Sequence, residues 1–76
     1  MNKHELVAGA SDVLARVMGD DSRPNRRKLE IILFLGASLQ RAADSLELED
    51  SDLHLPLADL FGRLARAEEA LLENEA

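Results

Sequence analysis

Apolar residues recur along most of the chain at spacings of three and four positions, which is the pattern of helices that bury one face. The longest apolar-rich run covers residues 26–46, and we interpret it as a central helix. In its second half the apolar residues share one side. In its first half they occur on nearly every side, so more than one neighbouring element must cover this helix.

The first predicted helix covers residues 2–18. Its apolar positions share one side when successive residues are placed 100° apart, and they are Leu6, Val7, Ala10, Val13, Leu14, Val17 and Met18. Asn2 is suited to cap this helix, with Glu5 three residues later as in a capping box. Gly19 is expected to stop the helix. The turn-forming residues 20–25 (DDSRPN) then reverse the chain into a helical hairpin.

The second predicted helix covers residues 24–46, and the third covers residues 53–73 with Pro56 in its first turn, where a missing backbone N–H is tolerated. The connection 47–55 carries four acids in nine residues and is predicted to be a solvated turn. The third helix has one apolar side, formed by Leu57, Leu60, Phe61, Leu64, Ala67, Leu71 and Leu72. The sequence therefore predicts an all-α fold. It also predicts that residues 1–76 form a single helical domain, a three-helix bundle of two helical hairpins around the long central helix.

A second apolar strip lies beside the main one on the central helix, formed by Leu29, Leu33 and Ala37. Phe34 points away from both strips, towards Arg41. A helix that packs between two neighbours accounts for the second strip but not for Phe34. We interpret Leu29, Leu33, Phe34, Ala37 and Arg41 as the contact surface for a protein partner or a second copy of the chain.

The small size of the chain also favours self-association. Seventy-six residues lie near the low end of what one apolar core can stabilise, and the absence of cysteine excludes a disulfide framework. We therefore expect a homodimer. Gly36, inside the central helix, is expected to permit the close approach of a neighbouring helix.

The charge is acidic overall but unevenly distributed. The net charge is −6, and one basic patch stands at the start of the central helix, formed by Arg23, Arg26, Arg27 and Lys28. Positive side chains are unfavourable at the positive end of a helix dipole, so the patch needs an explanation. It is either a site for an anion or an acidic partner, or it is neutralised within the chain by Asp20, Asp21 and Glu30.

Nothing in the sequence indicates catalysis, a cofactor or a metal site. The chain has no cysteine nucleophile and no glycine-rich phosphate loop, and its two histidines stand in polar segments. No run approaches the roughly 20 apolar residues that a membrane span needs, and we expect a cytoplasmic protein that is not an enzyme. The composition favours a small acidic protein-interaction module that acts as a regulator, adaptor or inhibitor. The alternative is a dimeric helical binder of RNA or DNA that uses the basic patch.

Overall fold

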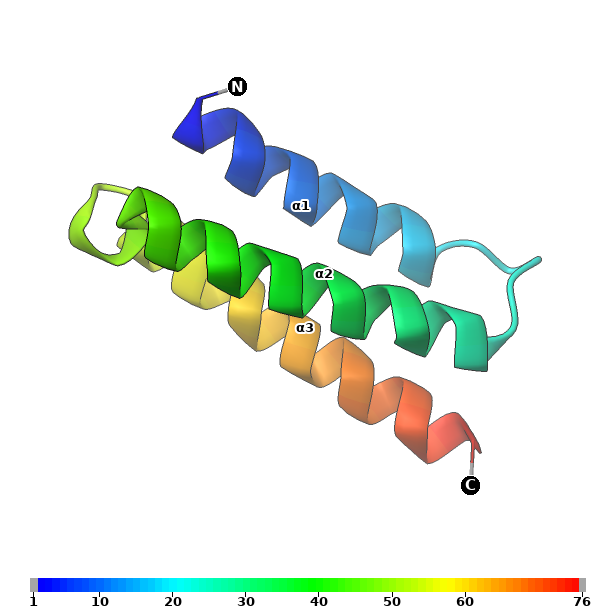
Figure 1. Ribbon diagram of the computed structural model, residues 1–76. Helices are drawn as coiled ribbons and strands as arrows, with labels where there is room; N and C mark the ends of the chain where they lie inside the picture. Colours follow the sequence, from blue (N-terminus) through cyan, green and yellow to red (C-terminus); the bar gives the residue numbers. More distant parts are fainter. Residues whose placement is uncertain (1, 76) are drawn as a thin grey trace.

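Three helices joined by two short connections make up the computed structural model, which describes residues 2–75 (Figure 1). The helices are α1 (Lys3–Met18), α2 (Asn25–Leu46) and α3 (His54–Glu75), with a short 3₁₀ helix, η1 (Leu48–Asp50), between α2 and α3. The described residues contain no strand. α2 runs antiparallel to both of its neighbours, so α1–α2 and α2–α3 are two hairpins that share α2. The predicted all-α class and the three helices are confirmed.

Local hydrogen bonds set the ends of α1. The Asn2 side-chain oxygen accepts the Glu5 N–H at 2.8 Å, so Asn2 caps the helix as predicted. Gly19 ends the helix and donates its N–H to the Ala15 carbonyl at 3.0 Å. Its φ of −86° is not the left-handed conformation in which C-terminal glycines often stand. The chain reverses instead through a turn around Asp20, whose carboxylate accepts the N–H of Ser22 at 3.1 Å.

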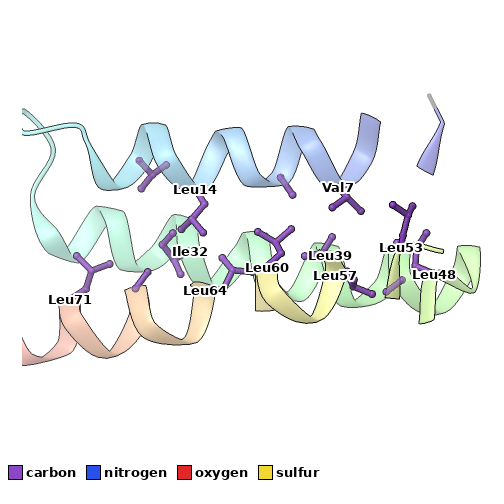
Figure 2. Packing of buried hydrophobic residues seen from close by; sticks show 14 residues of the cluster. Val7, Leu14, Ile32, Leu39, Leu48, Leu53, Leu57, Leu60, Leu64 and Leu71 are labelled. Carbon is purple, nitrogen blue, oxygen red and sulfur yellow. The ribbon is translucent and has the colours of Figure 1, made fainter. Parts of the chain in front are cut away.

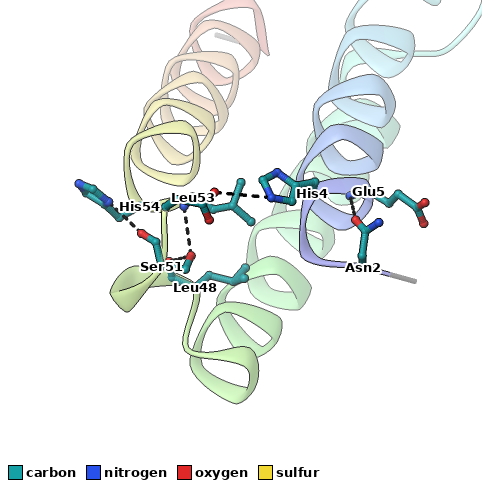
Figure 3. Close-up of polar contacts among 8 residues, drawn as sticks. Asn2, His4, Glu5, Leu48, Ser51, Leu53 and His54 are labelled. Atoms are coloured by element: carbon teal, nitrogen blue, oxygen red, sulfur yellow. Dashed lines mark hydrogen bonds and ion pairs between the residues drawn. The ribbon is translucent and has the colours of Figure 1, made fainter.

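The connection between α2 and α3 differs from its prediction. Glu47 ends α2 with a φ of 53°, in the left-handed region, and the chain then forms η1. Leu48 is fully buried and Leu53 is 5% exposed, so the segment predicted to be a solvated turn closes one end of the core. Ser51 holds this closure: its hydroxyl donates to the Leu48 carbonyl at 2.6 Å and accepts the Leu53 N–H at 3.1 Å (Figure 3). The acidic residues of this segment predict exposure to solvent, whereas its leucines Leu48 and Leu53 are buried in the core.

One hydrophobic core runs along the bundle axis (Figure 2). Its buried members come from all three helices and η1, and they are Val7, Ala10, Leu14, Val17, Ile32, Leu39, Ala43, Leu48, Leu53, Leu57, Leu60, Leu64, Ala67 and Leu71. The helices α2 and α3 pack against each other more extensively than either packs against α1. A hydrogen bond from the Arg63 guanidinium to the Ser11 hydroxyl, 2.8 Å long, joins α1 to α3 beside this core.

Several side chains assigned to the core side by periodicity are more exposed than that pattern implies. Val13 is 41% exposed and Leu72 is 51% exposed, because three helices leave the outer edges of each apolar side uncovered. Gly36 also departs from its expected role. A Cβ atom added there would meet nothing within 4 Å, so no neighbouring helix of the described chain requires a glycine at this position.

None of the three helices in residues 2–75 combines the length and the apolar character that a bilayer crossing requires.

Candidate interaction surface

The predicted contact surface divides into one core residue and four surface residues. Leu29 is half-buried and packs against the hydrophobic core, so it belongs to the bundle itself. Leu33 is 49% exposed and Phe34 is 73% exposed, while Ala37 and Arg41 are also exposed. Phe34 is the most exposed large hydrophobic side chain in the described part of the chain. The structure thus brings Leu33, Phe34, Ala37 and Arg41 together on α2 and separates Leu29 from them.

Helix geometry dictates the outward position of Phe34. Ile32 is 2% exposed and defines the core-facing side of α2. Two residues further on, Phe34 lies about 200° around the helix from Ile32, and Ala37 follows three residues later on the same outward side. Rotating α2 to bury Phe34 would expose Ile32 and Leu39. The exposure of Phe34 is therefore a property of the helix register and not of one side-chain conformation.

The apolar surface continues from α2 towards α3. A groove of about 280 Å³ separates the two helices at the surface. It is lined by Ile32, Leu33, Gly36 and Ala37 of α2 and by Phe61, Leu64, Ala65 and Glu68 of α3. On its other side, α2 borders a second apolar groove of about 260 Å³ that it shares with Val13 and other residues of α1. The outward side of α2 is thus a ridge between two shallow apolar grooves.

The predicted basic patch does not form a single surface. Lys28 is only 8% exposed, and its ammonium group donates to the Met18 carbonyl at 3.4 Å. This carbonyl stands in the last turn of α1, where the helix dipole is negative, so the lysine charge is favourable there. Lys28 comes four residues before the buried Ile32, and this spacing was the signal in the sequence that places it on the core side.

Two of the remaining bases pair with acids of the same chain. The Arg23 guanidinium lies 3.1 Å from the Asp20 carboxylate, and the Arg27 guanidinium lies 3.0 Å from that of Glu30. The hydrogen bond from the Ser22 hydroxyl, followed by that from Arg23, lowers the pKa of Asp20 below its ordinary value. Within the described residues, Arg26 forms no ion pair. These contacts favour neutralisation within the chain over a free anion site.

Polar contacts that join distant parts of the chain are few and were not predicted. Besides the Arg63–Ser11 hydrogen bond, the His4 imidazole lies 3.7 Å from the Asp52 carboxylate at the end of the bundle where η1 stands (Figure 3). Both side chains of the latter pair are largely exposed. Among the side chains of residues 2–74, no three of the kinds that bind metals cluster closely enough to hold an ion.

Searches with this chain find no matching protein-family model, no similar curated protein and no similar solved structure.

Proposed function

We propose that this protein is a small acidic protein-interaction module, which acts as a regulator, adaptor or inhibitor by binding a protein partner through the outward side of α2. The observation that carries the proposal is the 73% exposure of Phe34 next to Leu33 and Ala37, on a helix whose opposite side fills the core. Clustered apolar side chains of this kind on a small domain mark contact surfaces, and buried aromatic residues contribute strongly to such contacts.

The charges around Phe34 support a protein partner. Glu30 and Arg41 flank the apolar ridge, so a partner would meet an apolar centre within a rim of both signs. Charges at the rim of an interface select the partner and its orientation more than they raise affinity. A protein surface with the complementary charge order satisfies this pattern, whereas a polyanion does not.

The nucleic-acid alternative receives less support. Lys28 is buried, and Arg23 and Arg27 already pair with acids. Non-specific affinity for nucleic acid comes mainly from unpaired bases that neutralise phosphates, and a chain with a net charge of −6 repels a polyanion. Binding to RNA and DNA probes at low salt is the direct check on this alternative.

The proposal is tested by photo-crosslinking from position 34. Phe34 is replaced with a benzophenone amino acid of similar shape, and cells that produce the variant are irradiated. The same replacement at Leu55, which is 69% exposed on α3, is the matched control. We expect a discrete crosslinked protein from position 34 and none from position 55. If position 34 gives no product, or if both positions give the same products, the outward side of α2 is not the interaction surface.

A further inference from the structure

Six exposed residues follow one line along the outward side of α2. They are Arg27, Glu30, Phe34, Ala37, Arg41 and Asp44. Their spacings alternate between three and four residues, which is the repeat of the contact positions in a coiled coil. We name this line the outer seam. All six residues are exposed, so no described part of the bundle covers this line, although Ala37 also borders the groove between α2 and α3.

The outer seam is complementary to a second outer seam that runs in the opposite direction. From one end it reads basic, acidic, large apolar, small apolar, basic and acidic. If a two-fold axis passes between Leu35 and Gly36, the seam of one copy lies antiparallel against the seam of the other. Each residue then meets its complement: a base meets an acid, and the large Phe34 side chain meets the small Ala37 side chain.

We propose that a second copy of this chain covers the outer seam, so that two α2 helices pack antiparallel. Arg27 then faces Asp44 of the second copy, and Glu30 faces Arg41. Phe34 packs over Ala37 on each side of the two-fold axis. The inference rests on the proposed function, because it names the partner of the same surface.

Other arrangements of the two helices lose this complementarity. In a parallel pair each residue of the seam meets its own copy, so four of the six positions set like charges against each other. Sliding the antiparallel pair by one seven-residue repeat places Phe34 opposite Glu30 in one direction and opposite Asp44 in the other. Of these arrangements, the centred antiparallel register alone matches every position of the seam.

The charged residues of the outer seam also make contacts within their own chain, but these contacts are weak and oppose the pairing of two α2 helices only slightly. The Arg27–Glu30 pair has side chains 68% and 53% exposed, and surface pairs of this kind contribute little. Asp44 accepts a hydrogen bond from the Gln40 amide at 3.1 Å, which is also exposed. Only the Phe34 and Ala37 positions form an apolar centre. We therefore expect a dimer that dissociates on dilution, with its orientation set by charge.

Cysteine crosslinking tests the orientation, since the chain has no cysteine of its own. In the proposed dimer, the double variant Arg27→Cys/Asp44→Cys forms intermolecular disulfides. Arg27→Cys alone does not, because the two copies of position 27 stand about 25 Å apart along the helices. A parallel dimer gives the reverse outcome for the single variant. Crosslinking of Arg27→Cys alone therefore overturns the proposed orientation, and no crosslinking of either variant overturns the pairing.

Charge exchange tests the register. Arg41→Glu sets like charges against Glu30 of the second copy at two symmetric positions. We expect the dissociation constant of the dimer, measured by sedimentation equilibrium, to rise by at least about tenfold. Glu30→Arg/Arg41→Glu exchanges both signs and restores the dimer. Arg66→Glu, the same charge change at an exposed position of α3, is the control and leaves dimerisation unchanged. If the double variant dimerises no more tightly than Arg41→Glu, the proposed register is wrong.

The two proposals fail in different ways. If the wild-type protein is a monomer at every concentration but position 34 crosslinks a different protein in cells, the inference of a second copy fails and the proposed function stands. If neither experiment finds a protein at this surface, both fail.

Discussion

Truncation of Phe34 to alanine separates the stability of one chain from its association. About three quarters of the Phe34 side chain faces solvent in one chain. A phenylalanine presents about 200 Å² in total, so about 50 Å² is buried within the bundle, worth about 1 kcal/mol at 25 cal/mol per Å². Alanine regains about half of that through its higher helix propensity. We therefore expect Phe34→Ala to change the free energy of unfolding of the monomer by less than about 1 kcal/mol.

The same truncation has a large effect on a dimer. The two exposed Phe34 surfaces amount to about 300 Å², and covering half of this area contributes about 4 kcal/mol to association. Losing most of that contribution weakens the dimer by about two to three powers of ten. Sedimentation equilibrium measures the association, and urea unfolding at a concentration where the protein is monomeric measures the stability of the chain.

The control is Leu55→Ala, which truncates a side chain that is 69% exposed on α3 and changes neither quantity appreciably. Two results would refute the reasoning. A loss of about 3 kcal/mol or more in monomer stability would mean that Phe34 fills a core position. An unchanged dissociation constant would mean that Phe34 is not at the contact between the two copies.

Three stability predictions are checked by urea unfolding and one by titration. Leu48→Ala is expected to lower stability by about 2 to 5 kcal/mol, because Leu48 is fully buried; a small effect would mean that η1 is not part of the core. Glu47→Gly is expected to raise stability by about 0.5 to 1 kcal/mol, since Glu47 has a φ of 53°. Gly36→Ala is expected to raise stability by about 1 kcal/mol without changing association, because the added Cβ atom meets nothing within 4 Å. The pKa of Asp20, followed by NMR, should rise in Ser22→Ala, which removes the hydroxyl hydrogen bond that lowers it. Because the folded pKa is the lower one, the stability that Asp20 contributes is present above its ordinary pKa and is lost as the pH falls through the folded value.

Periodicity and end signals were sufficient to place the helices. The spacing of apolar residues gave α1, α2 and α3 with their ends within about two residues, and Asn2 caps α1 as its side chain suggests. Pro56 lies in the first turn of α3 for the same local reason. These features depend on groups a few residues apart, so a single sequence contains the information to predict them.

The same periodicity places Phe34 on the outward side of α2, since that position follows from the buried Ile32. The role of this surface as a contact, the homodimer and the protein partner stay predictions. The sequence pattern groups Leu29 with the surface because its strip continues to Leu33. Only the packing of α2 against the rest of the bundle separates the two residues, and it leaves Leu29 half-buried.

Contacts between different helices are decided only in the folded protein. The burial of Leu48 requires the ends of α2 and α3 to meet, and the burial of Lys28 requires its ammonium group to reach the Met18 carbonyl of α1. No local pattern encodes such distances. An acidic segment therefore closes the core, and a basic residue assigned to a surface patch belongs to the packing of two helices. Local propensities set where each helix begins, ends and faces, whereas burial depends on which surfaces the assembled helices bring together.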